Sequence, residues 1–158
     1  MSKIKNGYIE NMDGSFSYYK DNLLHREDGS ALCDEHNNKY WYLKGILHRK
    51  DGPAIIRDNG HKEWWQNGKL HREDGPAIEE PNGHKEWWIN GKVHREDGPA
   101  VEYANGDKEW VYNGKLHRKD GPAMEWLNGD KEWWYHGKKI SCSSNEEFLK
   151  LIKLKTFW

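Results

Sequence analysis

His94-Arg95-Glu96-Asp97-Gly98-Pro99-Ala100 is one of five copies of a seven-residue motif in this chain. The copies begin 23 residues apart, at His25, His48, His71, His94 and His117. A strict period of this length is typical of repeat proteins, in which each unit packs on its neighbours. The motif either carries the same chemistry five times or joins one repeat to the next.

The residues between two motifs predict short strands and tight turns. In the repeat from Pro76 to Val93, two Asn-Gly pairs flank a segment rich in Trp, Ile and Glu. Asn-Gly is the preferred pair for two-residue type I′ hairpin turns. We predict a mostly β fold in which 23-residue antiparallel hairpin repeats form a single-layer, solenoid-like sheet over residues 1–140. A degenerate partial repeat spans residues 7–24, and the full repeats start near residues 25, 48, 71, 94 and 117.

The period of the apolar residues changes after the last repeat. Ser144 and Glu147 fit a capping box, and apolar residues follow at helical spacing from Phe148. We predict a capping helix within residues 141–158, covering the open end of the array. The position two residues after Ile78 is aromatic only in the last two repeats, as Tyr103 and Trp126. We expect the helix to pack on these two residues. A dimer contact through the same helix is the alternative.

Two-residue turns would fix which residues share a face of the sheet. They predict Trp87 and His94 on one face, and Glu79, Glu86 and Arg95 on the other. Because facing glutamates destabilise a sheet, Arg95 is interpreted as the cation that stabilises the pair. A divalent cation or a cationic ligand bound by the paired carboxylates is the alternative.

The repeated histidines are interpreted as hydrogen-bonded packing residues. Strands lie about 4.8 Å apart, so equivalent histidines of adjacent repeats are roughly 10 Å apart or more. Zinc ligands must each lie about 2 Å from the metal, so neighbouring copies cannot share one ion. We predict neither a metal site nor a cofactor.

Composition excludes several classes of protein. Ten Trp and eight Tyr supply large apolar surfaces although only 35% of the residues are hydrophobic. The formal net charge of −1 argues against general nucleic-acid binding. No run approaches the ~18 apolar residues of a membrane span, and the start lacks a signal-peptide core. Cys33 and Cys142 lie in no CxxC pattern, which favours reduced thiols and a cytoplasmic location.

No catalytic residue can be named from the sequence. The chain has no P-loop, HExxH or GxSxG pattern, and neither cysteine lies in a local activating motif. Catalysis on a periodic array would also require one motif copy to differ sharply from the others. We therefore expect a protein that is not an enzyme.

Trp, Tyr and Arg dominate the binding energy of protein interfaces. The column formed by Trp64, Trp87, Trp110 and Trp133 is interpreted as core, whereas the neighbouring tryptophans are expected on the other face with the arginines. The predicted contact residues are therefore Trp65, Trp88, Trp134, Arg72, Arg95, Arg118, Tyr103 and Trp126. The leading hypothesis is a non-enzymatic binding or scaffold protein that contacts a protein partner or itself.

The segment Trp88-Ile89-Asn90-Gly91-Lys92-Val93-His94 resembles the Trp-x-x-Gly-Lys-x-His core of MORN (membrane occupation and recognition nexus) repeats. The resemblance spans roughly residues 13–140, with Arg in place of the Gly that usually follows the His. The longer phrase Asn-Gly-Lys-x-His-Arg-x-Asp-Gly-Pro-Ala looks like a MORN-variant repeat of uncharacterised phage, large-virus and bacterial proteins. It implies an array of hairpins used for protein contacts or self-association.

A phage or viral origin would imply a target among host factors, in the host cytoplasm. The second hypothesis follows from this, and from Arg and Lys beside Trp. It is the sequestration of a small anionic, nucleotide-like ligand as an antagonist of host-defence signalling. Specific function is expected where the copies differ, at Ile56 and Arg57, Tyr103, Val111, Met124 to Leu127 and the final helix.

Overall fold

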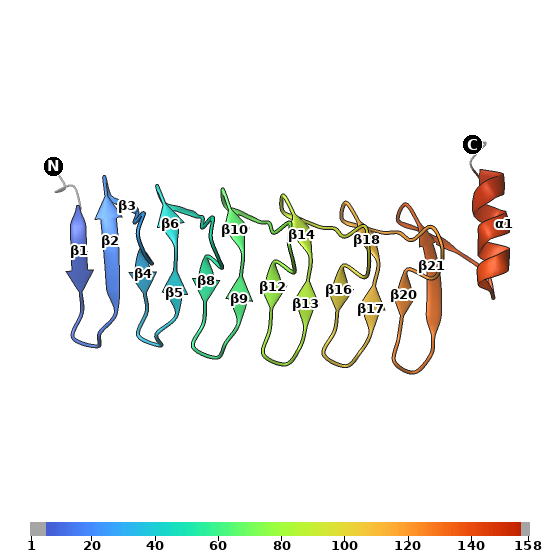
Figure 1. The fold of residues 1–158 in the computed structure, drawn as a ribbon, viewed down its shortest axis with the longest axis horizontal. Helices are drawn as coiled ribbons and strands as arrows, with labels where there is room; N and C mark the ends of the chain where they lie inside the picture. Colours follow the sequence, from blue (N-terminus) through green and yellow to red (C-terminus); the bar gives the residue numbers. More distant parts are fainter. Residues whose placement is uncertain (1–5, 156–158) are drawn as a thin grey trace. The chain divides into compact units, whose positions relative to one another are not determined.

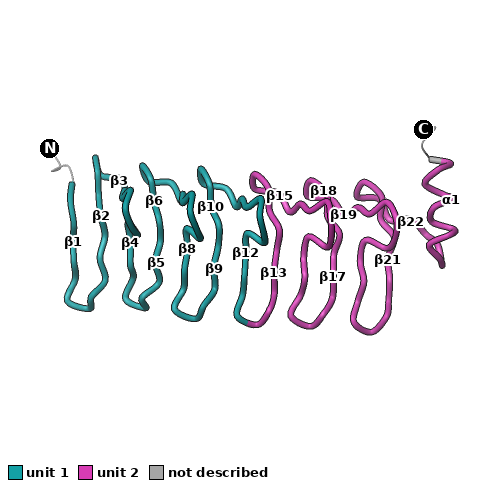
Figure 2. Tube along the Cα trace, viewed as in Figure 1, with its two compact units in different colours: residues 1–81 teal, residues 82–158 magenta. Residues whose placement is uncertain are grey.

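The structure, a computed structural model, describes residues 6–155. It divides into two compact units, residues 1–81 and residues 82–158, which Figure 2 distinguishes by colour. The predicted boundary between array and helix, at residues 140 and 141, stays a prediction. Within the described residues, no helix has the length and apolar character needed to cross a membrane.

The first unit consists of short antiparallel strands (Figure 1). They are β1 (Gly7–Glu10), β2 (Phe16–Lys20), β3 (Leu23–Leu24), β4 (Leu32–Cys33), β5 (Lys39–Tyr40), β6 (Tyr42–Leu43), β7 (Ile46–Leu47), β8 (Ile55–Ile56), β9 (Lys62–Glu63), β10 (Trp65–Gln66), β11 (Lys69–Leu70) and β12 (Ile78–Glu79). The main sheet of this unit has the order β1-β2-β4-β5-β8-β9-β12, with β3 paired to β2.

The second unit continues the pattern and ends in the helix. Its elements are β13 (Lys85–Glu86), β14 (Trp88–Ile89), β15 (Lys92–Val93), β16 (Val101–Glu102), β17 (Lys108–Glu109), β18 (Val111–Tyr112), β19 (Lys115–Leu116), β20 (Met124–Glu125), β21 (Lys131–Tyr135), β22 (Lys138–Ile140) and α1 (Asn145–Lys155). The order here is β13-β16-β17-β20-β21-β22. The predicted fold class is confirmed, because the chain is mostly β, its hairpins are antiparallel and the strand order is open.

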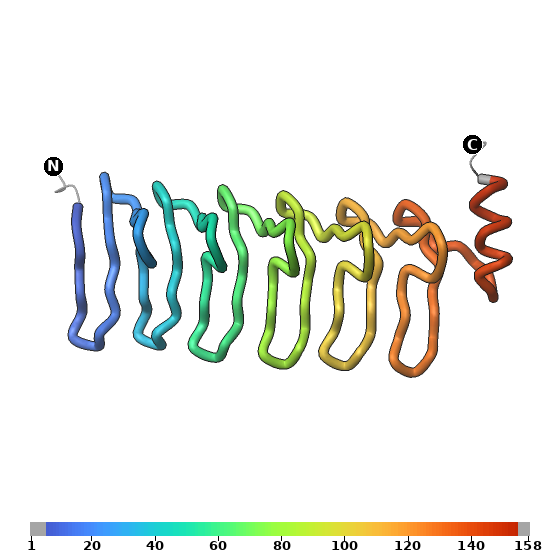
Figure 3. The backbone as a smooth tube through the Cα atoms, viewed as in Figure 1, coloured from blue at the N-terminus to red at the C-terminus, as the bar shows by residue number. Residues whose placement is uncertain are grey.

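Each repeat contains a long hairpin and a short one, which Figure 3 shows as a deep loop followed by a small one. In the fourth full repeat these are β16–β17 and β18–β19. Trp110 lies where the strand changes partner: its N–H donates to the Ala123 carbonyl of the next repeat, and its carbonyl accepts from the His117 N–H. In this repeat the tryptophan therefore marks the branch point, which is why β17 and β18 are separate strands, whereas β21 of the last repeat continues through Trp133.

The short hairpins have the predicted turn. Asn90 and Gly91 both have positive φ, at 52° and 77°, as a type I′ turn requires. The long hairpins do not. Glu102 faces Lys108, and the Tyr103 N–H donates to the Asp107 carbonyl, so the loop has three residues with Gly106 at φ 95°. This is the three-residue loop that ends in a left-handed glycine.

The extra loop residue changes which side chains share a face. Glu102 lies opposite Lys108 in its own hairpin and opposite Lys85 of the preceding repeat. The predicted rows are therefore wrong: glutamate faces lysine, and Trp87 lies on the same face as Arg95, whose guanidinium stacks on its ring. Opposite charges across strands stabilise the sheet without a further cation. The alternative, a metal ion bound by paired glutamates, is not supported, because Glu102 faces lysines on both neighbouring strands.

The motif alanines form the most deeply buried column. Ala31, Ala54, Ala77, Ala100 and Ala123 are all 0% exposed. Each is held by the backbone; for example, the Ala100 N–H donates to the Glu109 carbonyl and its own carbonyl accepts from Trp87. The motif alanine is therefore a core residue that is hydrogen-bonded through its backbone to the strands on both sides of it.

Ala100→Leu is expected to lower the free energy of unfolding by about 1–2 kcal/mol, because added bulk in a closely packed site forces the neighbours to move. Ala104→Leu, in the exposed loop of the next hairpin, is the control, and its effect should stay within about 0.5 kcal/mol. Urea unfolding followed by tryptophan fluorescence measures both. Equal effects of the two variants would contradict the assignment of Ala100 to the core.

The predicted helix forms over Asn145–Lys155, and residues 156–158 of the predicted range lie outside the described residues. Ser144 Oγ accepts from the Glu147 N–H as predicted, but the Glu147 carboxylate reaches back to the Ser143 N–H. Phe148 is fully buried. Figure 2 shows α1 beyond β21 and β22. The expected packing on Tyr103 is therefore wrong, and packing on Trp126 stays a prediction.

Candidate binding groove

Every copy of the motif places its arginine over an aromatic ring. The guanidinium carbon lies 4.0–4.1 Å from the ring centroid in all five repeats. The pairs are Arg26 on Tyr18, Arg49 on Trp41, Arg72 on Trp64, Arg95 on Trp87 and Arg118 on Trp110. A desolvated cation over an aromatic face is stabilising by about 0.5–2 kcal/mol.

The remaining motif residues hold the same guanidinium. Arg95 Nε donates to Asp97 at 2.9 Å, and Arg95 Nη1 lies 3.2 Å from the Pro99 carbonyl oxygen and 3.4 Å from Glu102. Gly98 leaves room for it, because a Cβ there would lie 2.9 Å from the guanidinium carbon. The motif is therefore a structural joint that binds its own arginine.

The motif histidines join consecutive repeats. The Nδ1 atom of His94 accepts from the backbone N–H of Asn113 at 3.1 Å, and His117 accepts from His136 at 3.0 Å. His25 and His48 make the equivalent bond in the first unit. The interpretation of these residues as hydrogen-bonded packing residues is confirmed. Because Nδ1 is an acceptor, the proton of the neutral ring lies on Nε2.

The predicted contact residues do not form one surface. Trp65, Trp88 and Trp134 donate from Nε1 to Glu63, Glu86 and Glu132, on the face opposite the Arg–Trp stacks. Arg72, Arg95 and Arg118 lie in those stacks. The expectation that these tryptophans and arginines share a face is wrong, for the register reason given above.

Two further predicted residues lie in long-hairpin loops. The Tyr103 hydroxyl donates to Glu109, and its ring lies 5.3 Å from that of His84. Partial burial and the Glu109 carboxylate raise the pKa of Tyr103 to about 12. Trp126 is half-buried in the β20–β21 loop, where its N–H donates to the Asp130 carbonyl. Neither residue lines the grooves described next.

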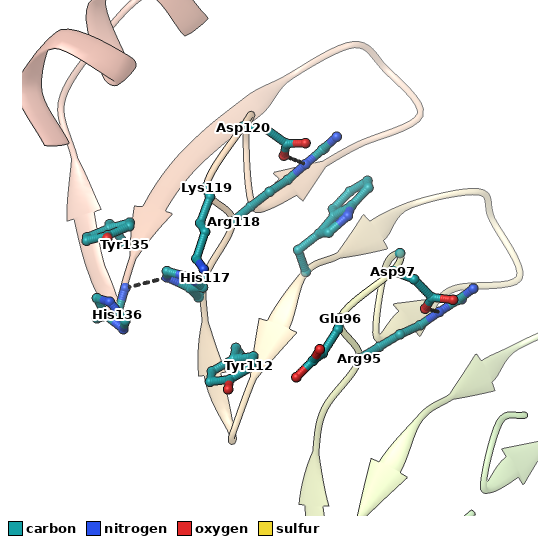
Figure 4. Close-up of a pocket in the computed structure, with 12 residues that line it drawn as sticks. Arg95, Glu96, Asp97, Tyr112, His117, Arg118, Lys119, Asp120, Tyr135 and His136 are labelled. Carbon is teal, nitrogen blue, oxygen red and sulfur yellow. Dashed lines mark hydrogen bonds and ion pairs between the residues drawn. The ribbon is translucent and has the colours of Figure 1, made fainter. Parts of the chain in front are cut away.

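Grooves recur between successive repeats on the side of the motif. Of three such grooves, two lie in the first unit, and the largest of the three, of about 780 Å³, lies in the second (Figure 4). Each is bordered by the Asp-Gly of one motif and by the Trp and His-Arg of the next. A volume of this size is within the range of ligand sites.

The large groove differs from the others in its aromatic residues. The position occupied by Leu43, Gln66 and Ile89 in earlier repeats becomes Tyr112 and Tyr135 here. The turn position, Lys or Asn elsewhere, becomes His136. The rings form a continuous cluster around His117, which lies 4.3 Å from His136, 4.8 Å from Tyr135 and 5.9 Å from Tyr112.

Sequence reasoning missed this cluster. The signal was present in the repeat columns, since two adjacent positions become aromatic only near the C-terminal end of the array. The expectation that function lies where copies differ named Tyr103 and Val111 but did not name Tyr112, Tyr135 or His136. The rings of Tyr112 and Tyr135 both come close to His117 only because the short hairpins of neighbouring repeats lie side by side, which the sequence alone does not show.

Charge in the large groove is nearly balanced. Arg95 and Arg118 are each paired at 2.9 Å with the exposed carboxylates Asp97 and Asp120. The side chain of Lys119 runs towards the His117 ring (Figure 4). Burial, then the proximity of His136 and Lys119, lower the pKa of His117 below its ordinary value.

Stability should therefore depend on pH through His117. Its folded-state pKa lies below the unfolded value of about 6.5, so the stabilisation is complete above that pH and is lost as pH falls towards the folded-state pKa. Urea midpoints measured from about pH 7.5 to about pH 5 should fall less for His117→Asn, which keeps an acceptor near the His136 N–H without titrating. An equal fall in both proteins would contradict this role.

The groove has donors, carboxylates and rings, but no serine or cysteine among its lining residues. Cys33 and Cys142 are unpaired and lie outside it, and burial raises the pKa of both thiols. Among residues 6–155, no cluster of three or more His, Cys, Asp or Glu side chains could hold a metal ion. The arrangement is suited to holding a ligand by stacking and hydrogen bonds.

No protein-family model matches the chain, and no curated protein matches it either.

Proposed function

We propose that this chain is a non-enzymatic, repeat-based binding protein that contacts a protein partner through the groove between its last repeats. The observation that carries the proposal is the change of the groove position from Leu, Gln or Ile to Tyr112 and Tyr135. The His, Arg, Asp, Gly and Ala of the motif are the same in every repeat, and the arginine is bound by contacts within the chain, so these residues give no reason for one groove to differ.

The chemistry of the two tyrosines supports a contact surface. Tyrosine is enriched at interface hot spots because a rigid ring buries a large area at low entropic cost. Tyr112 remains 39% exposed although its ring lies 4.6 Å from that of His94. The exposed side chain is therefore held in a fixed place by the scaffold, and a fixed contact residue loses little entropy on binding.

The resemblance to MORN-variant repeats adds the partner class. It favours a protein contact or self-association, with a host factor as the target if the chain is phage- or virus-encoded. Self-association would raise the molar mass of the purified protein, whereas binding of another protein would leave the purified protein a monomer. Light scattering measures this molar mass and so separates the two cases.

Affinity capture from a host lysate tests the proposal. The wild-type protein and Tyr8→Ser, which changes an exposed tyrosine outside the groove, should retain the same partner. The double variant Tyr112→Ser/Tyr135→Ser should lose it while keeping its unfolding midpoint. Equal retention by all three proteins would contradict the groove, and no enriched partner together with a monomer by light scattering would contradict the function.

A second candidate is the sequestration of a small anionic, nucleotide-like ligand. One feature favours it, the Lys119 ammonium beside stacked rings in the groove. It has less support than a protein contact, because the two groove arginines are already paired with Asp97 and Asp120. Thermal-shift and calorimetric screening against cyclic and ADP-ribose-type nucleotides tests this candidate. No change in the unfolding temperature at millimolar ligand would contradict it.

A further inference from the structure

The third motif position is glutamate in three repeats and lysine in two. It is Glu27, Lys50, Glu73, Glu96 and Lys119 in the five repeats. In the three glutamate repeats the carboxylate lies 3.4–3.7 Å from Nε2 of the motif histidine. Since Nε2 carries the ring proton wherever Nδ1 accepts a hydrogen bond, the glutamate there faces a donor.

In the last repeat this carboxylate is missing. Lys119 replaces the glutamate, so an ammonium lies beside a ring that already directs an N–H donor to the same region (Figure 4). His117 is only 9% exposed, and its Nδ1 accepts from the His136 N–H, so Nε2–H is the ring donor that remains for a ligand. A bound acceptor would take the place that the glutamate oxygen occupies in the three glutamate repeats.

The position of Lys119 brings a cation next to the histidine. Arg95 and Arg118 are paired with Asp97 and Asp120. Glu96, the third carboxylate of the groove, lies on the other rim, 3.7 Å from His94. Lys119 is therefore the cation that acts on His117, where its proximity helps to lower the pKa of the ring.

The walls of this position are unlike those of the other lysine repeat. His117 lies between Tyr112 and Tyr135, at centroid distances of 5.9 and 4.8 Å. The equivalent positions around His48, beside Lys50, are Leu43 and Gln66. Of the three grooves described above, the one in the second unit combines two tyrosines, a histidine N–H and a lysine, so Lys50 provides a matched control.

We propose that this groove binds a carboxylate that takes the place of the glutamate missing at position 119. His117 Nε2–H and Lys119 Nζ donate to its oxygens, and the Tyr112 and Tyr135 rings contact the carbon chain attached to it. The inference rests on the proposed function in one respect: the expected source is an Asp or Glu side chain of the protein partner.

Titrations followed by NMR of the histidine ring nitrogens test the site directly. The probes are benzoate with benzamide as its neutral counterpart, the peptide Ac-Ala-Glu-Ala-NH2 with its Gln counterpart, and inorganic phosphate. All titrations are at constant ionic strength and at pH 7, where the carboxylates are ionised. Site-specific signals report binding at His117 separately from His48 and His94.

Benzoate and the Glu peptide should give saturable shifts at His117, and the neutral counterparts should give none. Lys119→Glu restores the residue found in three other repeats and should weaken carboxylate binding by at least about tenfold, since it removes a charge-assisted donor and adds a repelling charge. Lys50→Glu should leave the His117 shifts unchanged. Lys119→Gln should lie between wild type and Lys119→Glu.

The outcomes separate the two proposals. No saturable shift at His117, or equal shifts in wild type and Lys119→Glu, would overturn the carboxylate site while leaving a protein contact through the tyrosines intact. Binding of benzoate but not of the Glu peptide would support the site and count against a protein as the source. Stronger binding of phosphate than of either carboxylate would overturn the assignment to a carboxylate.

Discussion

Phe148→Ala is expected to release the C-terminal helix from the last repeat. Phe148 is the only large side chain that is fully buried among the described residues, and Ile140, also buried, comes shortly before it in the chain. Truncating a buried Phe costs about 3–5 kcal/mol. A helix of eleven residues is not stable in water by itself, so it should unfold once this anchor is lost.

Hydrogen exchange measured residue by residue checks this expectation. Amides of α1 should lose their protection in Phe148→Ala, while amides of β13 to β19 keep theirs, because repeats contact only their neighbours. Leu154→Ala is the control, since Leu154 lies on the same helix but is 67% exposed. Equal loss of helix protection in the two variants would show that Phe148 is not the anchor.

Arg95→Ala is expected to lower the free energy of unfolding by about 2–3 kcal/mol. The change removes the stacking on Trp87 and leaves Asp97 and the Pro99 carbonyl without their donor. Arg95 is 23% exposed, so the ion pairs contribute less than fully buried pairs would. Arg95→Lys should recover little of the loss, because an ammonium is neither planar nor able to donate in a fork.

Glu96→Ala provides the control for Arg95→Ala. It changes the next motif residue, which is 74% exposed, and its effect should stay within about 0.5 kcal/mol. Chemical denaturation of the three variants measures these differences. A loss for Arg95→Ala no larger than that for Glu96→Ala would mean that the arginine does not hold the repeat together.

The period and turn residues were sufficient to predict the fold class. A strict spacing of 23 residues, Asn-Gly pairs and a change to helical spacing after residue 140 predicted hairpin repeats followed by a helix. Turns and helix caps are determined by residues that are close together in the chain, so they can be predicted from the sequence. The short type I′ turns and the histidine hydrogen bonds were predicted for the same reason.

The register could not be predicted from the turn residues alone. Asn105-Gly106 fits a two-residue turn as well as a three-residue loop that ends in glycine, and the difference of one residue exchanges the two faces. The side chain of Asn105 accepts from the Asp107 N–H at 3.1 Å, which stabilises the longer loop. The assignment of Trp88 and Arg95 to one surface was wrong as a consequence.

The candidate groove depends on contacts between repeats. Tyr112 and Tyr135 are 23 residues apart, and only the pairing of successive hairpins brings both rings to His117. A comparison of repeat columns could have singled out these positions, because they become aromatic where the earlier copies are not. The sequence shows that Lys119 replaces the glutamate next to His117, but the ring nitrogen that carries the proton could not have been assigned without the hydrogen bond from the His136 N–H to Nδ1.

The repeated motif holds its own arginine, and for this reason we propose that recognition lies where the repeats differ. A double-mutant cycle between Arg95 and Trp87, using Arg95→Ala and Trp87→Leu, tests this claim most directly. We predict a coupling energy of about 1 kcal/mol in the free energy of unfolding, as expected for a stacked cation and ring. Single effects that add within about 0.3 kcal/mol would contradict it, and would leave the motif arginines available for a ligand.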